Sequence, residues 1–197
     1  MWRPVDTEFF APQTPVAVCC LPESGGRGEN LRSLLESLGC VVLLHSIGTP
    51  GDFLKVIAQT LTAPRYFLIV GHGLPEGLFF GTYAEGLGID ISMLHGECLP
   101  ADAIRAHVQL AGTTIIADCC YGAAPSLVDA FLSRGAAAYI GTNEALGIES
   151  DVFLVNFFYR ALTRREADPI ACAGAIAATG PEVQSIRYYA GDVVSSI

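Results

Sequence analysis

The sequence predicts an α/β domain whose sheet is mostly parallel and lies between two layers of helices. Short apolar runs rich in Val, Ile and Leu alternate along the chain with amphipathic segments of helical period. Continuous apolar runs are typical of strands that are buried on both faces, as in a parallel sheet covered by helices. The 197 residues suffice for one domain with a full core.

Five apolar runs are expected to form the strands. They are Pro15–Leu21, Cys40–Ile47, Arg65–Gly73, the run from Thr113 into two adjacent cysteines, and Ala136–Thr142. Several of these runs break at glycine, which is typical where a strand ends in a turn. The domain is expected to span residues 1–197, with residues 1–14 as an N-terminal extension and residues 180–197 as a C-terminal tail.

Six amphipathic segments are expected to form helices, and three of them end on a glycine, a typical stop signal. They are Leu31–Gly39, Pro50–Ala63, Pro100–Gly112, Ser126–Gly135, Asp151–Arg164 and Pro169–Thr179. The glycine-rich stretch Leu74–Leu99 is expected to hold a hairpin that runs through Gly77–Gly81 and Leu87–Ile91. This alternation of strands and helices favours a doubly wound arrangement.

Composition excludes several classes of function. The net charge is −9 and only 16% of the residues are charged, and there is no cluster of Lys and Arg that would bind nucleic acid. No apolar run is long enough to cross a membrane, and the N-terminus lacks the apolar core of a signal peptide. The seven cysteines are therefore expected to be free thiols in a reducing, cytoplasmic compartment.

Two expected strand ends carry reactive side chains. His72 follows the third strand, and Cys119 and Cys120 follow the fourth. Working residues of such sheets gather at the carboxyl ends of the strands, so neighbouring third and fourth strands would bring imidazole and thiol together. A nearby imidazole can take the proton of a thiol and leave the nucleophilic thiolate.

Strand alternation distinguishes the two thiols. Residues two apart share a side, so Asp118 and Cys120 point one way and Cys119 points the other way. Cys120 is therefore the candidate nucleophile and Cys119 a small buried apolar residue. The backbone amides of Gly73 and Cys120 are the candidate oxyanion hole.

The His72/Cys120 pair also has less specific interpretations. A histidine after a strand is often structural, and adjacent cysteines are often packing residues. A zinc site built from His95, Cys98 and the cysteine pair is less favoured, because adjacent cysteines chelate poorly. The α/β-hydrolases and cysteine glutaminases are excluded by residue order, since their catalytic histidine follows the nucleophile whereas all four histidines precede Cys120.

The order His-Gly, then an apolar strand that ends in Asp-x-Cys-x-Gly, resembles the caspase-like cysteine peptidases of clan CD. His72 lies 120 − 72 = 48 residues before Cys120, close to the caspase spacing. "DCCYG" is similar to the D-x-C of metacaspases, and the region after it resembles separases and CHAT peptidases, although "NEAL" stands where those families usually have tryptophan. This resemblance implies a caspase-like three-layer sandwich with His72 as general base and Cys120 as nucleophile.

The resemblance also implies peptide hydrolysis through a thioester without a cofactor. The expected partners are a protein or peptide substrate and an activating or recruiting protein. Two other functions stay open, namely a catalytically silent caspase-like adaptor and a flavodoxin-like domain that binds a small molecule. The latter would need a phosphate-binding loop after the first strand, and "PESGGRGEN" lacks G-x-G-x-x-G.

The carboxylate of Asp118 suggests the substrate specificity. An unpaired carboxylate beside the thiol would favour a basic residue, Arg or Lys, just before the scissile bond. Glu23 and Glu144 are candidates for a second acid, because both follow strands that end at the same edge. The alternative is that Asp118 caps the helix near Pro125 or pairs with one of the protein's own arginines.

Overall fold

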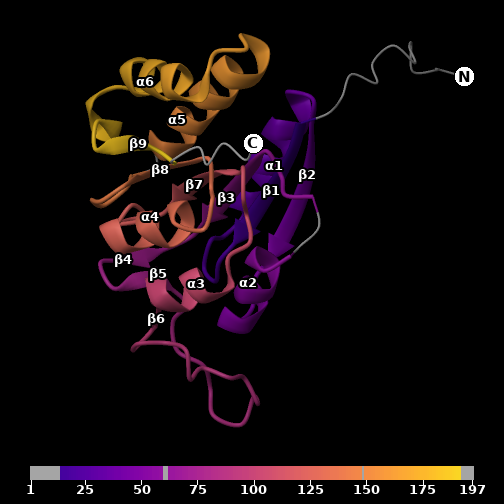
Figure 1. The fold of residues 1–197 in the computed structure, drawn as a ribbon, viewed down its shortest axis with the longest axis vertical. Helices are drawn as coiled ribbons and strands as arrows, with labels where there is room; N and C mark the ends of the chain where they lie inside the picture. The colour runs from indigo at the N-terminus through magenta and orange to yellow at the C-terminus, as the bar shows by residue number, and fades with distance from the viewer. Residues whose placement is uncertain (1–13, 60–61, 148, 192–197) are drawn as a thin grey trace, which may run out of the picture.

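A computed structural model describes residues 14–59, 62–147 and 149–191 (Figure 1). Apart from Thr14, the expected N-terminal extension lies outside the described residues. The central sheet has the order β2-β1-β3-β7-β8-β9. Its strands are β1 (Thr14–Cys20), β2 (Cys40–Ser46), β3 (Tyr66–Val70), β7 (Thr114–Asp118), β8 (Ala138–Thr142) and β9 (Ile186–Ala190). All neighbouring pairs are parallel except β8 and β9, which confirms the mostly parallel sheet.

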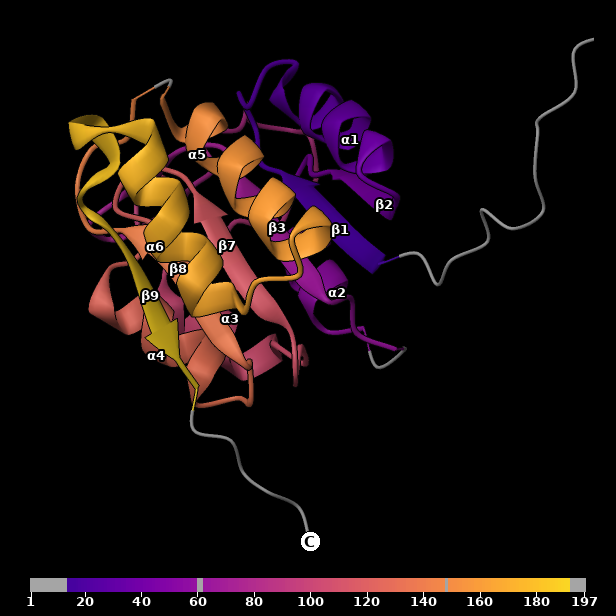
Figure 2. The same cartoon turned by 90° about the horizontal axis from the view of Figure 1, so that it is seen from above.

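Two layers of helices cover the sheet, as predicted (Figure 2). One face carries α2 (Pro50–Ile57), α3 (Ala101–His107) and α4 (Pro125–Leu132). The other face carries α1 (Arg27–Ser37), α5 (Glu149–Phe158) with its π-helical continuation η2 (Tyr159–Thr163), α6 (Asp168–Thr179) and the short 3-10 turn η3 (Pro181–Val183). No helix in the described ranges has the length and apolarity needed to cross a membrane.

Strand alternation divides the interior into two cores. In β3, Phe67 and Ile69 face α2, α3 and α4, whereas Leu68 and Val70 face the layer of α1, α5 and α6. All five residues of β3 are buried, and so are all five residues of β7. This burial on both faces explains why these strands have continuous apolar sequences.

The prediction of a C-terminal tail is wrong for Ile186–Ala190, because this segment forms β9, the last strand in the order of the central sheet. Tyr189 lies opposite Tyr139 of β8 in an antiparallel register. The strand was missed because its sequence, IRYYA, has no continuous apolar run. An edge strand needs only partial burial, and here Ile186 is buried whereas Arg187 and Ala190 are exposed.

The expected hairpin is only partly right. A small sheet contains β4 (Gly73–Leu74), β5 (Gly77–Phe79) and β6 (Cys98–Leu99) in that order. Leu87–Ile91 is not a strand, and Leu87 and Ile91 are exposed. The segment between β5 and β6 instead projects from the body of the domain (Figure 1).

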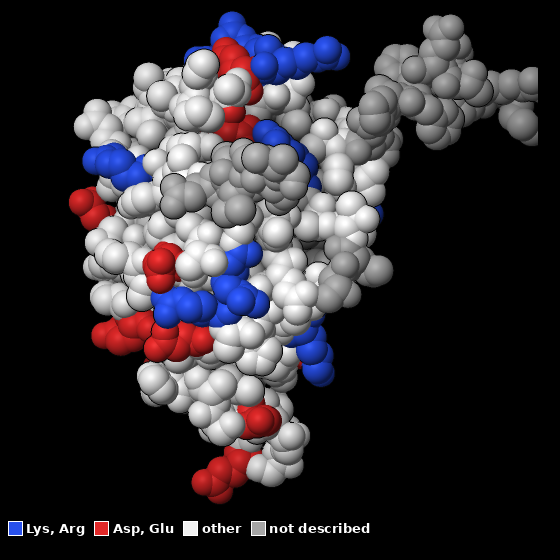
Figure 3. Space-filling view, in the orientation of Figure 1, with Lys and Arg blue, Asp and Glu red and all other residues white. Residues whose placement is uncertain are grey.

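This projecting segment contains Glu85, Asp90 and Glu97. Acidic side chains are visible on it at the bottom of Figure 3. On the face shown in Figure 3, the basic side chains lie in small groups beside acidic ones. This face therefore presents no broad positive surface of the kind that binds nucleic acid.

Asp168, the first residue of α6, holds this helix to the amino ends of β3 and β7. Its carboxylate accepts hydrogen bonds from the hydroxyls of Tyr66 at 2.8 Å and Thr114 at 2.9 Å. It also pairs with the Arg65 guanidinium at 3.0 Å. Tyr66 and Thr114 are themselves opposite each other in the β3–β7 register, so one buried carboxylate joins two strands and a helix.

We expect Asp168→Ala to destabilise the fold strongly. The substitution leaves two buried hydroxyls without an acceptor, and each such group costs about 1–3 kcal/mol. Urea unfolding under reducing conditions measures the change in the free energy of unfolding. The matched control is Glu36→Ala, which removes the exposed Arg32–Glu36 pair on α1 and should cost about 0.3–0.5 kcal/mol. Equal losses in the two variants would contradict the assigned role of Asp168.

Candidate active site

The ends of β3 and β7 bring the two predicted reactive positions together. The strands are parallel neighbours, and Val70 lies opposite Asp118 in their last paired position. The N–H of Gly71 then donates to the Asp118 carbonyl at 3.3 Å. Because His72 and Cys120 each follow two residues after this pair, their backbones leave the sheet at the same level.

Gly73 lies directly against the backbone of Cys120. A Cβ atom at position 73 would overlap the Cys120 carbonyl oxygen and would lie 3.4 Å from the Sγ of Cys119. Only a residue without a side chain allows this approach. The glycine that follows the histidine is therefore required by the packing of the two strand ends.

The backbone N–H groups of Gly73 and Cys120 are free of the backbone ladder. Phe79 donates its N–H to the His72 carbonyl at 3.0 Å, and Gly73 pairs with Leu78 in the next position of the β4–β5 hairpin. Hydrogen-bonded and non-hydrogen-bonded pairs alternate in an antiparallel ladder, so the Gly73 N–H points away from β5. Within the described ranges, no backbone carbonyl accepts from the Cys120 N–H either.

The two thiols have different environments. Cys119 is 2% exposed and packs in the core below α3 and α4. Burial and the neighbouring Asp118 carboxylate raise the pKa of the Cys119 thiol, which leaves it protonated and unreactive at neutral pH. Cys120 is half-buried, and its Sγ accepts a hydrogen bond from the Leu146 N–H at 3.2 Å.

A strained turn lifts Cys120 out of the sheet. The next residue, Tyr121, has a left-handed backbone with φ of 51°, which is uncommon for a residue with a side chain. Its N–H donates to the Glu144 carbonyl at 2.9 Å, and its carbonyl accepts from Ala124 at 2.9 Å. These contacts with the β8–α5 loop and with the start of α4 hold the turn in place.

His72 is exposed at the surface. Its ring meets the Phe79 ring edge to face, with 6.4 Å between the ring centroids. The imidazole is therefore positioned by β5 and stays accessible to water and to a ligand.

Asp118 is buried and paired, contrary to the expectation of an unpaired carboxylate. It is 2% exposed, and its Oδ2 accepts from Nη2 of Arg27 at 2.5 Å. The same nitrogen lies 3.0 Å from the Ser150 hydroxyl and 3.0 Å from the Asp151 carboxylate. The alternative in which Asp118 pairs with an arginine of the chain is thus realised, and the reason is that a buried carboxylate requires a nearby positive charge.

This pairing leaves one acceptor unused. The Oδ1 atom of Asp118 is buried and has no hydrogen-bond partner among the described residues. Burial raises the pKa of the Asp118 carboxyl, and the Arg27 guanidinium and the neighbouring Ser150 hydroxyl oppose that rise. With Asp151 beside them, two carboxyl groups share one guanidinium.

The two candidates for a second acid lie at different places on this edge. Glu144 is exposed, and its backbone contacts Tyr121 in the turn after the thiol. Glu23 is exposed in the loop that leads from β1 to Arg27, with a left-handed φ of 63°. Neither carboxylate pairs with a cation within the described ranges.

His95 lies away from these strand ends. It exchanges backbone hydrogen bonds with Cys98 at 2.9 and 3.2 Å, and the Cys98 side chain is buried. Within the described part of the chain, no three side chains of His, Cys, Asp or Glu lie close enough to bind a metal ion. His95 and Cys98 thus form an isolated antiparallel β-bridge.

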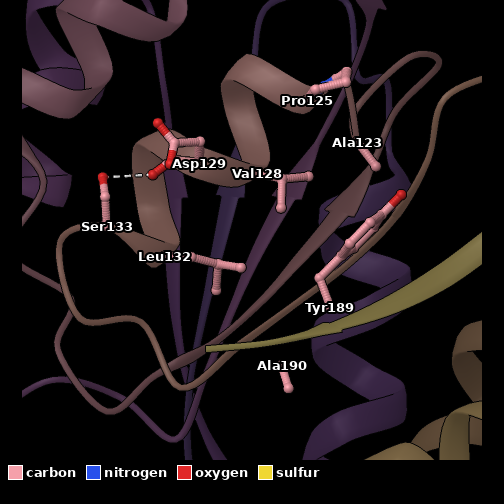
Figure 4. Close-up of a pocket in the computed structure, with 8 residues that line it drawn as sticks. All are labelled: Ala123, Pro125, Val128, Asp129, Leu132, Ser133, Tyr189 and Ala190. Carbon is pink, nitrogen blue, oxygen red and sulfur yellow. Dashed lines mark hydrogen bonds between the residues drawn. The ribbon is translucent and has the colours of Figure 1, made fainter. Parts of the chain in front are cut away.

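A wider hollow lies between α4 and β9 (Figure 4). Its volume is about 490 Å³, and its wall contains Val128 and Leu132 from α4 and Tyr189 from β9. Neither His72 nor Cys120 lines it. The hollow is thus separate from the candidate active site, and its size alone assigns it no role.

Sequence reasoning missed two residues that contact the predicted site. Arg27 lies 91 positions from Asp118 in the chain, and its signal was a single arginine in a glycine-rich loop after the first strand. Leu146 contacts the thiol through its backbone, which no side-chain pattern can indicate.

Comparisons with known proteins support the fold. No family model matches the sequence, and no curated protein matches it. Among solved structures, the chain is similar to the Arg-specific cysteine proteinase gingipain R (RgpB), with a TM-score of 0.52 and 12% identity over 84% of this chain and 41% of that chain. A complex of the pro- and mature domains of Porphyromonas gingivalis RgpB gives a TM-score of 0.51 and 11% identity over 84% and 42%.

The chain spans about two-fifths of the length of those gingipain chains. At such identities the similarity concerns the fold alone. The chain therefore has an α/β fold that matches the caspase-like domain of gingipain, which confirms the predicted architecture.

We expect Gly73→Ala to disrupt the junction of β3 and β7. The added methyl group meets backbone atoms that cannot rotate away, and overpacking of this kind typically costs about 1–3 kcal/mol. Urea unfolding measures the loss, with Gly51→Ala as the control, because a Cβ on Gly51 meets only Oγ1 of Thr49 at 3.8 Å. Unchanged stability in Gly73→Ala would mean that the strand ends lie farther apart than described.

Proposed function

We propose that this protein is a cysteine endopeptidase with His72 as general base and Cys120 as nucleophile. The observation that carries the proposal is the pairing of β3 with β7 up to Val70 and Asp118, together with the approach of Gly73 to the Cys120 backbone. A half-buried thiol next to a left-handed turn, an exposed imidazole and two backbone N–H groups without a backbone acceptor lie at this edge. These are the parts that acyl transfer through a thioester requires.

Each part has a role in the proposed reaction. His72 takes the proton of Cys120, and the thiolate attacks the carbonyl carbon of the substrate peptide bond. The N–H groups of Gly73 and Cys120 stabilise the oxyanion that forms. His72 then donates the proton to the leaving amine, and a water molecule hydrolyses the thioester and restores the thiol. No cofactor is required.

The proposed specificity is for a basic residue, Arg or Lys, just before the scissile bond. Its support is the Asp118 cluster, in which two carboxylates share the Arg27 guanidinium and the buried Oδ1 of Asp118 has no partner. A cationic side chain would fill this acceptor without displacing Arg27, which uses Oδ2. Glu144 is the better placed second acid because its backbone contacts the turn after Cys120, and Glu23 stays the other candidate.

A peptidyl electrophile that carries arginine before the warhead should label Cys120 exclusively. Mass-spectrometric mapping of the adduct checks this expectation. Cys119→Ala should still be labelled, because the Cys119 thiol is buried and its pKa is raised, whereas Cys120→Ala should not be labelled. An adduct on Cys119 would refute the assignment, and an unlabelled wild type would favour a catalytically silent adaptor.

The same assignment predicts the effect of the histidines on peptide cleavage. His72→Ala should slow cleavage by roughly 10²–10⁴-fold, the usual contribution of a general base. His95→Ala is the matched control, since both histidines precede a glycine but His95 lies in a separate bridge. Equal loss of kcat/KM in the two variants would contradict the role of His72.

Reporter peptides with Arg, Lys, Asn or Asp before the scissile bond test the specificity. We expect a preference for Arg, and we expect Asp118→Asn to lower kcat/KM for Arg by roughly 10–100-fold, the value of one charge-assisted hydrogen bond. The Asn reporter is the internal control for an intact active site. A preference for Asp, or an unchanged preference for Arg in Asp118→Asn, would overturn the assigned pocket.

A further inference from the structure

We propose that Leu146 closes the substrate side-chain pocket, and that a cation binding at Asp118 displaces Leu146 and releases the Cys120 thiol in the same step. The identity of the ligand rests on the proposed function, whereas the coupling between the pocket and the thiol rests on contacts of Leu146 alone. Leu146 would thus determine both which side chains enter and when the thiol is free.

Leu146 contacts the nucleophile through its backbone. Its N–H donates to the Cys120 Sγ at 3.2 Å, and the Sγ lies 3.8 Å from the Leu146 carbonyl oxygen. The thiol is therefore engaged on the β8 side of its turn, whereas the β3 side carries His72.

Leu146 also lines a small cavity at Asp118. The cavity lies below the ends of β7 and β8, and its volume is about 10 Å³. Such a space holds a single water molecule at most. Asp118 and Ser150 provide polar groups in its wall, and Oδ1 of Asp118 has no partner there among the described residues. The rest of the lining is mostly apolar, and no amino-acid side chain fits into the cavity as it stands.

The wall formed by Leu146 is the less constrained part of this cavity. The remaining apolar lining belongs to strands and to α5 and is buried, with Ile116, Ile140, Phe153, Leu154 and Ile186 as its large residues. Leu146 is half-buried and lies in the loop between β8 and α5, outside any helix or strand. Moving Leu146 therefore opens the cavity without breaking the sheet or a helix.

The two contacts couple ligand binding to the state of the thiol. Residue 146 cannot leave the cavity wall by a shift of its loop and keep its N–H on the Cys120 Sγ. A ligand that displaces Leu146 by shifting its loop, and not by rotating its side chain alone, therefore competes with the Leu146–Cys120 hydrogen bonds. The energy of satisfying Asp118 Oδ1 favours the open arrangement, because a buried acceptor without a donor is unfavourable.

Hydrogen–deuterium exchange at the Leu146 amide tests this coupling without any need for peptidase activity. The probe is the propylguanidinium ion, which matches the end of an arginine side chain and is too short to be a substrate. Neutral propylurea, of similar shape, is the control ligand. We expect propylguanidinium to accelerate exchange at Leu146 in the wild type by roughly two- to tenfold, as for the loss of one hydrogen bond.

Each outcome of this experiment is decisive. Acceleration by propylguanidinium but not by propylurea, and its loss in Asp118→Asn, would support the proposal. Unchanged exchange at saturating propylguanidinium, equal effects of both ligands, or no binding of either would overturn it. Cleavage of no reporter peptide together with accelerated exchange would reject the peptidase function and keep the coupled pocket.

Leu146→Ala provides a second measurement that does not depend on exchange rates. Removing the side chain opens the cavity in advance, so propylguanidinium should bind more tightly by roughly five- to tenfold, about half the burial energy of a leucine. Leu87→Ala, in the exposed projecting segment, is the control and should leave the Kd unchanged. Weaker or equal binding by Leu146→Ala would contradict the closing role of Leu146.

Discussion

The in-register pairing of β3 with β7 is the constraint on which the candidate site depends. Val70 and Asp118 are the last partners of the two strands, so the residues that follow leave the sheet together. Two glycines, Gly73 and Gly122, then allow the chain segments beyond this pair to pack closely. Gly73 allows the hairpin after β3 to touch the Cys120 backbone, and a Cβ on Gly122 would overlap the buried Cys119 sulfur at 2.7 Å. The sulfur of Cys119 therefore fills the space that these glycines leave open, and Cys120 lies outside it.

The buried carboxylates at the two edges of the sheet differ in how fully their oxygens are hydrogen-bonded. At the amino edge, Asp168 accepts from two hydroxyls and one guanidinium, which is typical of a purely structural network. At the carboxyl edge, Asp118 has one paired oxygen and one oxygen without a partner. A fully satisfied network adds stability, whereas an unsatisfied buried acceptor costs free energy. This difference distinguishes the carboxylate at the candidate site from the structural carboxylate at the amino edge.

The sequence predicted best what depends on local pattern. Buried strands such as Tyr66–Val70 and Thr114–Asp118 have continuous apolar sequences, and both were located within a few residues. Prediction failed at Ile186–Ala190, where an antiparallel edge strand is only partly buried, and at Cys98–Leu99, where two residues complete a small sheet. It offered an arginine as a partner of Asp118 only as an alternative and could not identify Arg27, which reaches Asp118 through tertiary structure from 91 residues away. Pairing of charges across the fold leaves no mark on local sequence.

The two adjacent thiols differ in burial because β7 ends at Asp118, just before them. Cys119 continues the alternation of β7 and enters the same core as Ala117, where burial raises the pKa of its thiol. One residue later the chain must turn, and the left-handed conformation of Tyr121 is held by backbone hydrogen bonds to Glu144 and Ala124. This turn is unfavourable for tyrosine in isolation and persists only because the surrounding structure holds it. One of these bonds comes from the β8–α5 loop, which also bears Leu146, and the other comes from Ala124 just before α4. The loop that helps to hold the turn after Cys120 is therefore the same loop that contacts its sulfur, so this segment affects both the position of the thiol and its accessibility.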